Sequence, residues 1–100
     1  GTPQFMGPEM YSGQFLRDIA KYEQTNDLYA IGASLFYILT LRYPYWDSKA
    51  NRPNFSRQEP LNSGNACIDS LIHGLINTNP DTRMTAEQGL QLLNSPLCQM

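Results

Sequence analysis

Charged side chains are scarce in this sequence. Asp, Glu, Lys and Arg make up 16% of the 100 residues, whereas soluble domains average about 25%. The seven basic and nine acidic residues give a net charge of −2, and their scatter favours neither nucleic acid nor a membrane surface as a partner. So low a charge indicates that another protein surface covers part of this one.

Cysteine and long hydrophobic runs are also scarce. Cys67 and Cys98 stand far apart and outside any CxxC or Cys/His spacing, so we expect neither a zinc site nor a disulfide, and a reducing compartment is the default. The longest apolar run, YAIGASLFYILTL at 29–41, is interrupted by Ser34 and Thr40 and is shorter than a membrane span of about 20 residues. No signal peptide is recognisable near the N-terminus. These absences favour a soluble, intracellular and cytoplasmic protein.

The strongest helical pattern runs from residue 26 to 41. Apolar residues recur there at helical spacing and also occupy most other faces; they include Leu28, Ile31, Leu35, Phe36, Tyr37, Ile38, Leu39 and Leu41. A helix that is apolar nearly all round is buried. Thr25, Asn26 and Asp27 are N-cap candidates, and a carboxylate there suits the positive end of the helix dipole. The pattern therefore predicts a buried central helix that begins near Asn26.

Two shorter helices are predicted further along the chain. Residues 66–76 carry a core-facing apolar stripe. TAEQ at 85–88 has the form of a capping box, and the helix that it starts should end near Ser95, before Pro96. Residues 47–64 are polar and contain two prolines, which predicts irregular structure with at most one short helix. Strand signals are absent, so the sequence predicts an all-α protein.

Taken singly, the candidate functional residues have simple structural explanations. Asp27 has the position of a helix-start residue. His73 has no cysteine or carboxylate at metal-binding spacing, so a packed or surface imidazole is the simpler interpretation. Glu9 and Arg83 are solvated charges unless something pairs them.

Four motifs, taken in order, resemble the C-terminal lobe of eukaryotic protein kinases. GTPQFMGPE at 1–9 is similar to that family's Gly-Thr-x-x-Phe/Tyr-x-Ala-Pro-Glu, which ends the activation segment, and DLYAIG at 27–32 is similar to Asp-x-Trp-Ser-x-Gly, which opens its central helix. YPYW at 43–46 lies where a Pro-Phe follows that helix, and NPDTRMTAEQGL at 79–90 is similar to Asp-Pro-x-x-Arg-x-Thr-Ala-x-x-x-Leu. The resemblance runs from Gly1 almost to the end of the chain and implies a helical lobe around a buried central helix.

The resemblance implies a substrate-binding role for the first residues. Thr2, Pro3, Gln4 and Phe5 would belong to the loop that binds the peptide substrate. In Ser/Thr kinases the hydroxyl that matches Thr2 lies beside the catalytic Asp, whereas tyrosine kinases build this loop around a Pro and a Trp. Gly1 and Thr2 therefore indicate Ser/Thr specificity.

The resemblance also implies structural roles for Glu9, Arg83, Asp27 and Gly32. In the family, the Glu that matches Glu9 forms a buried ion pair with the Arg that matches Arg83. Arginine suits this pairing because its planar fork fits a carboxylate. The Asp that matches Asp27 holds the backbone of the catalytic loop, and Gly32 closes the motif that Asp27 opens.

The motifs that carry out phosphoryl transfer are missing. There is no GxGxxG, no His-Arg-Asp and no Asp-Phe-Gly, which in kinases hold ATP and Mg and position the substrate hydroxyl. We therefore interpret residues 1–100 as the C-terminal part of a kinase domain, without the N-lobe and the catalytic loop. This segment alone should be inactive and should contain no catalytic, cofactor-binding or metal-binding residue. The complete kinase would use ATP and Mg, and its partners would be a protein substrate and the rest of the domain.

Some positions depart from the family pattern. Gly7 replaces Ala, Tyr29 replaces Trp, Tyr45 replaces Phe and Asn79 replaces Asp, and none of these changes removes a catalytic group. The stretch MYSGQFLRDIAKYEQ at 10–24 has a faint similarity to IKK-related kinases. The alternative to an active kinase is a pseudokinase or a truncated, non-catalytic scaffold, and a third interpretation is a small helical interaction domain that matches by chance. The residues that precede Gly1 in the parent protein would discriminate between enzyme and scaffold.

Overall fold

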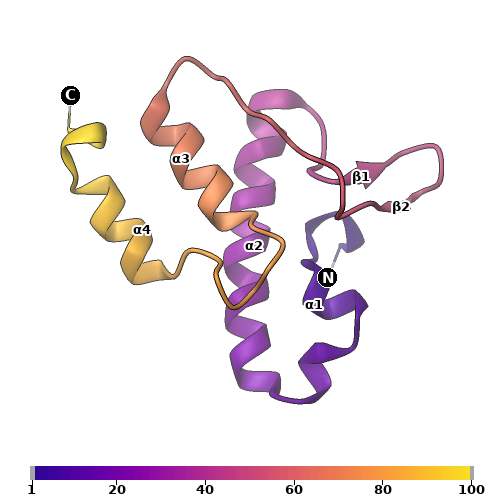
Figure 1. The fold of residues 1–100 in the computed structure, drawn as a ribbon. Helices are drawn as coiled ribbons and strands as arrows, with labels where there is room; N and C mark the ends of the chain where they lie inside the picture. The colour runs from indigo at the N-terminus through magenta and orange to yellow at the C-terminus, as the bar shows by residue number, and fades with distance from the viewer. Residues whose placement is uncertain (1, 100) are drawn as a thin grey trace.

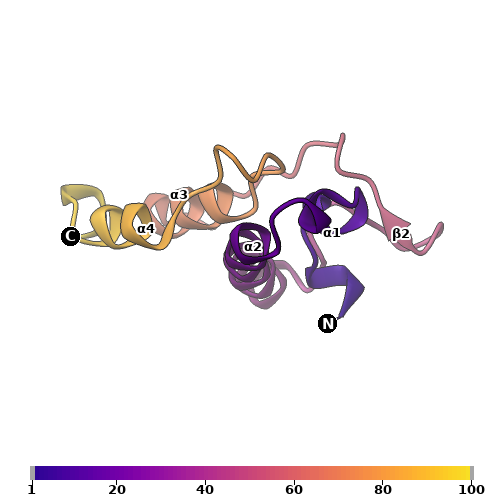
Figure 2. The same cartoon turned by 90° about the horizontal axis from the view of Figure 1, so that it is seen from below.

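The computed structural model describes residues 2–99 and is built around one long helix, α2, at Ile19–Thr40 (Figure 1). Helices α3 (Ala66–Leu75) and α4 (Ala86–Leu93) lie on one side of α2, and the short helix α1 (Pro8–Tyr11) lies on the other, near strands β1 (Trp46–Asp47) and β2 (Arg52–Pro53). Single 3-10 turns occupy Pro3–Phe5, Gln14–Leu16 and Pro96–Cys98. Seen from below, α4, α3 and α2 stand in a row (Figure 2). The predicted all-α class is confirmed.

The predicted start of the central helix is wrong. Helix α2 begins at Ile19, well before Asn26, because Asp18 caps it: a side-chain oxygen of Asp18 accepts a hydrogen bond from the backbone N–H of Lys21 at 3.1 Å. Asp27 therefore lies inside the helix rather than at its head. The helix ends as predicted near residue 41, where Leu41 takes a left-handed φ of 58°.

Helix α2 is buried on one face only, which corrects the prediction of burial all round. Tyr29, Ala33 and Phe36 form the core with two residues of the α3 segment, Ile72 and Ile76. On the opposite face Ile31 is 52% and Ile38 70% exposed. The difference arises because α3 packs on one side of α2 and α1 with the first two 3-10 turns on another, whereas nothing among residues 2–99 covers the face that carries Ile31 and Ile38.

Gly32 marks the closest approach of α2 and α3. A Cβ atom added at Gly32 would lie 2.6 Å from Cβ of Leu75 and 2.9 Å from Cγ2 of Ile76. The contact includes the backbone of Leu75 at 3.2 Å, so the neighbouring helix could not simply turn a side chain away. A glycine at this position therefore lets the two helices pack closely.

Helices α3 and α4 confirm the two shorter predicted helices. The capping box at the start of α4 is present: Thr85 Oγ1 accepts from the backbone N–H of Gln88 at 3.1 Å, and Gln88 Oε1 accepts from the backbone N–H of Thr85 at 2.9 Å. Asn65 is the N-cap of α3, and its side chain accepts a hydrogen bond from the backbone N–H of Ile68. Both starts agree with the prediction, the first made from the apolar stripe and the second from the capping box.

A disulfide joins Cys67, in the first turn of α3, to Cys98 in the last 3-10 turn. The expectation of two separate thiols is therefore wrong. The spacing of the cysteines along the chain gave no sign of the pairing, because it depends on α3 and residues 96–98 lying side by side. Their Cα atoms are 5.0 Å apart.

The segment predicted as irregular contains a small hairpin. Strands β1 and β2 pair in antiparallel fashion, Trp46 opposite Pro53 and Asp47 opposite Arg52. Two-residue strands leave almost no alternation for a sequence pattern to detect, which is why the hairpin was not predicted. Among residues 2–99, no helix has both the length and the apolar character that crossing a membrane requires.

Candidate functional site

The candidate site is centred on Glu9, a carboxylate buried at the start of α1. Gly7 is the N-cap of α1 and Pro8 its first residue, as a turn from loop to helix favours. Glu9 lies in the first turn of α1 and is 0% exposed. A buried carboxylate needs a partner of opposite charge, and the chain supplies one from its other end.

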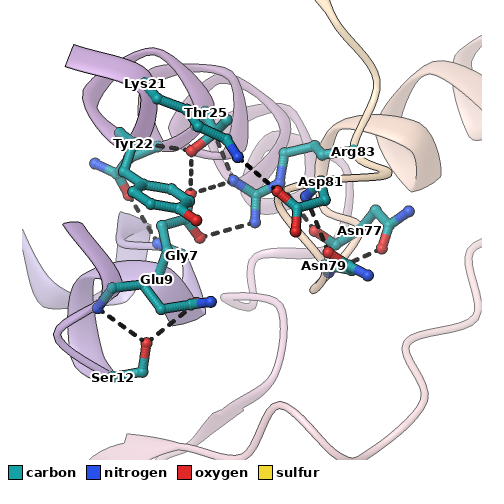
Figure 3. A network of polar contacts seen from close by, with 12 residues as sticks. Gly7, Glu9, Ser12, Lys21, Tyr22, Thr25, Asn77, Asn79, Asp81 and Arg83 are labelled. Atoms are coloured by element: carbon teal, nitrogen blue, oxygen red, sulfur yellow. Dashed lines mark hydrogen bonds and ion pairs between the residues drawn. The ribbon is translucent and has the colours of Figure 1, made fainter. Parts of the chain in front are cut away.

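Glu9 and Arg83 form a two-point ion pair, which confirms the predicted contact (Figure 3). Arg83 Nη1 donates to Glu9 Oε2 at 2.5 Å, and Nη2 donates to Oε1 at 3.0 Å. Arg83 is 3% exposed. The two residues are 74 positions apart, so the pair joins the N-terminal segment to the turn between α3 and α4.

Arg83 binds three further groups. Its Nε donates to the backbone carbonyl of Asn77 at 2.9 Å, and Nη1 also donates to the backbone carbonyl of Thr25 at 2.7 Å. The guanidinium carbon lies 5.1 Å from the ring centre of Tyr29, within the range of a cation–π contact. One arginine therefore connects α1, α2 and the turn that follows α3.

Thr25 and Asn26 belong to this site, although their sequence pattern resembles a helix cap. The Thr25 hydroxyl donates to Glu9 Oε2 at 2.7 Å, and Asn26 Oδ1 accepts from the backbone N–H of Gly7 at 2.8 Å. A Cβ atom at Gly7 would lie 2.6 Å from Glu9 Oε1, so the glycine leaves room for the carboxylate. The sequence analysis missed Thr25 and Asn26 because side chains typical of helix caps can also serve tertiary contacts.

The hydrogen bonds keep Glu9 ionised. Burial alone would raise the pKa of the Glu9 carboxyl, but the hydrogen bonds from Arg83 and Thr25 and the positive charge of Arg83 outweigh it. The pKa of Glu9 therefore lies below its ordinary value of 4.5.

This lowered pKa predicts a loss of stability in acid. Because the folded state holds the carboxylate ionised, the contribution of Glu9 is complete above about pH 4.5 and is lost as the pH falls through the lower pKa of the folded state. We expect the free energy of unfolding, measured by urea titration at a series of pH values, to fall in this acid range. A Glu9→Gln variant should lose part of that dependence, and equal acid slopes in the two proteins would contradict the assignment.

The four residues predicted to bind substrate lie together at the N-terminal end of the described chain. Pro3, Gln4 and Phe5 form the first 3-10 turn, and Thr2 precedes it with an exposed side chain that makes no capping hydrogen bond. The ring of Phe5 packs edge-on against Tyr43 at 5.3 Å. Gly1 lies outside the described residues.

Asp27 and His73 are both exposed, and neither side chain hydrogen-bonds to Glu9 or Arg83. The side chain of Asp27 makes no hydrogen bond within residues 2–99. Its role in holding the backbone of a catalytic loop therefore stays a prediction. His73 Nε2 lies 3.1 Å from the backbone carbonyl of Glu59. Within residues 2–99, no three His, Cys, Asp or Glu side chains are grouped in a way that could hold a metal ion.

Comparison with known proteins identifies several protein kinases that are similar to this chain in sequence. A protein of Dictyostelium discoideum named "Probable myosin light chain kinase" is 29% identical over 97 residues, covering 90% of this chain and 29% of the relative. Serine/threonine-protein kinase PknD of Chlamydia abortus is 31% identical over 98 residues, covering 91% and 10%. The human phosphorylase b kinase gamma catalytic chain, liver/testis isoform, is 29% identical over 100 residues, covering 91% and 24%.

The matches include almost the whole of this chain but only a minor part of each relative. The chain spans about a third or less of the length of these curated kinases. No family model matches it, and no solved structure gives a significant match. The similarity to IKK-related kinases stays a prediction. Several Ser/Thr kinases align with about nine tenths of this chain at about 30% identity, and its fold is helical, so the chain is similar to a segment of the C-terminal lobe of protein kinases.

Proposed function

We propose that this chain is the peptide-binding part of a Ser/Thr protein kinase, which transfers the γ-phosphate of ATP to protein Ser or Thr. The observation that carries the proposal is the buried pair of Glu9 and Arg83. It fixes the turn at residues 3–5 to the base of the helical lobe through α1. A loop that must hold a flexible peptide in one geometry needs such an anchor, because misplacement of the reacting groups lowers the rate steeply.

In this proposal residues 2–5, of which Thr2 and Pro3 are exposed and Gln4 and Phe5 are partly buried, contact the substrate. The Thr2 hydroxyl helps to place the hydroxyl that receives the phosphate, and Pro3, Gln4 and Phe5 form the surface beneath the peptide. Asp27 is exposed on α2, where its carboxylate is available to accept hydrogen bonds from the backbone of a catalytic loop. These residues position the reactants and do not themselves transfer phosphate.

Nucleotide and metal would be bound by residues that this chain does not contain. The sequence has no glycine-rich phosphate loop, and residues 2–99 contain no cluster of metal-ligating side chains, so they do not fit ATP or Mg. The exposed apolar face of α2, with Ile31 and Ile38, would face the rest of the kinase domain. The proposed partners are therefore that domain and a protein substrate.

A kinase assay with Thr2 variants tests the proposal. The purified parent protein is incubated with Mg-ATP and with peptides that differ only in carrying Ser, Thr or Tyr. We expect phosphate on Ser and Thr but not on Tyr. Thr2→Val should lower kcat by about tenfold or more, because the substrate hydroxyl is no longer held in place, and Thr2→Ser should retain activity.

Thermal unfolding supplies the control, because the Thr2 side chain makes no capping hydrogen bond and Thr2→Val should leave Tm unchanged. If Thr2→Val left the rate of phosphate transfer unchanged, the result would contradict the role of the Thr2 hydroxyl in placing the substrate. A folded protein that transfers no phosphate to any peptide would contradict the kinase proposal and favour the non-catalytic scaffold.

A further inference from the structure

The basic residues are concentrated around the hairpin. Residues 42–57 contain four of the seven basic side chains, Arg42, Lys49, Arg52 and Arg57, and a single acidic one, Asp47. This segment, which we call the basic hairpin, has a net charge of +3, whereas the rest of the chain has −5. The charges are therefore less evenly scattered than the sequence analysis states, because this one segment is cationic.

One side of the basic hairpin forms an open pocket of about 560 Å³. Arg42, Lys49 and Arg57 line it together with the aromatic rings of Tyr43 and Trp46. Asp47 also lines it, but its Oδ1 accepts hydrogen bonds from the backbone N–H groups of Lys49 and Ala50 at 3.0 and 3.1 Å. The three cations outnumber this one carboxylate, so the lining of the pocket retains an excess of positive charge.

The buried carboxylate of Glu59 contacts two of these cations, Arg42 and Arg57. Its side chain is 3% exposed, and its Oε1 accepts a hydrogen bond from Nε of Arg57 at 2.6 Å. Nη2 of Arg42 lies 3.4 Å from Oε2 of Glu59, and the guanidinium carbon of Arg42 lies 5.4 Å from the centre of the Phe36 ring. These contacts already restrict the side chains of both arginines, so less side-chain entropy is lost when they bind an anion.

A second pocket, of about 270 Å³, connects the basic hairpin to the proposed substrate loop. Pro3 and Gln4 line it from the loop, and Arg52 and Pro53 line it from β2. Trp46 lines both pockets, so they are neighbours. Lys49 and Arg52 form no ion pair with any residue from 2 to 99, and both are exposed.

We propose that the basic hairpin binds an acidic segment of the protein substrate. The inference rests on the proposed function, because the second pocket joins the hairpin to the loop at residues 3–5. A peptide bound at that loop would place its flanking residues beside Arg52 and Lys49, where Glu and Asp side chains find complementary charge. Four cations on a chain of net charge −2 are too few for the long basic surface typical of nucleic-acid binding.

The first test measures binding without ATP. A fluorescein-labelled peptide with a run of Glu beside one Ser is compared, by fluorescence anisotropy with the parent protein, with the same peptide carrying Gln. We expect tighter binding of the Glu peptide, weakened by added salt because the charges are exposed. The double variant Lys49→Glu/Arg52→Glu should bind it about tenfold less well. Arg17→Glu, which reverses an exposed charge outside the hairpin, should have little effect.

Three outcomes would overturn the inference: equal binding of the Glu and Gln peptides, an equal loss in Arg17→Glu, or tighter binding of oligouridylate than of the Glu peptide. Circular dichroism and Tm of the double variant check that it folds. A milder pair, Lys49→Gln/Arg52→Gln, should give a smaller loss in the same direction.

A second measurement separates this inference from the proposed function. In the kinase assay the Glu peptide should have a lower KM than the Gln peptide, and Lys49→Glu/Arg52→Glu should remove that difference, whereas Arg17→Glu should keep it. Phosphate transfer to the Glu and Gln peptides with equal KM would contradict the acidic-segment site but not the kinase proposal. Selective binding of the Glu peptide without any transfer would support the acidic-segment site and contradict the kinase proposal.

Discussion

Replacing Arg83 by alanine is expected to lower the free energy of unfolding by about 3–5 kcal/mol, because the substitution leaves the buried carboxylate of Glu9 without its partner. Arg83 also donates to the backbone carbonyls of Thr25 and Asn77, and both would be left without these donors. Urea unfolding of the wild-type and variant proteins measures the difference. In the complete kinase, activity and Tm should fall together, since the loss acts through the fold.

A matched control is available between α2 and the turn that contains Asp81. Lys21 Nζ lies 2.9 Å from Asp81 Oδ1, but both side chains are about half exposed. Lys21→Ala should therefore change stability little, because water replaces the lost partner. Arg83→Lys should recover only part of the stability, since an ammonium group cannot form the two-point contact with Glu9. A small effect of Arg83→Ala, similar to that of Lys21→Ala, would contradict the role given to the pair.

Reducing the bond between Cys67 and Cys98 is expected to lower the free energy of unfolding by about 3–4 kcal/mol, because the disulfide restricts the unfolded chain. The bond spans 31 positions of sequence, and the entropy that such a crosslink removes from the unfolded state grows with loop length. Urea unfolding with and without dithiothreitol measures the effect.

The variant Cys67→Ser/Cys98→Ser separates loss of the crosslink from other effects of the reductant. Its stability should match that of the reduced wild-type protein and should not respond to dithiothreitol. A wild-type protein that shows equal stability in both conditions would contradict a stabilising crosslink between α3 and residues 96–98.

The sequence predicted those parts of the fold that local signals determine. Thr85 and Gln88 cap α4 through neighbours three positions away, so their pattern is sufficient to identify the helix start. The start of α2 was misplaced because Thr25 and Asn26 resemble caps but use their side chains to bind Glu9 and Gly7. A residue type suited to a cap cannot reveal which of these contacts it makes.

The candidate site depended on contacts between distant parts of the chain. Glu9 and Arg83 looked like ordinary surface charges until the resemblance to kinases paired them, and the structure then placed them in contact. No comparable pattern linked Cys67 to Cys98 or brought Arg52 near Gln4. Such proximities follow from the packing of α3 on α2 and from the path of the hairpin, which periodicity and capping do not encode.

The separation of Glu9 and Arg83 along the chain also bears on how the protein folds and unfolds. Closing a contact between residues 74 positions apart requires α2, α3 and the turn after α3 to be in place, so we expect the pair to form late in folding. An interaction absent from the folding transition state leaves the folding rate almost unchanged and slows unfolding. We therefore expect the ion pair to slow unfolding more than it speeds folding, so that it prolongs the lifetime of the native state.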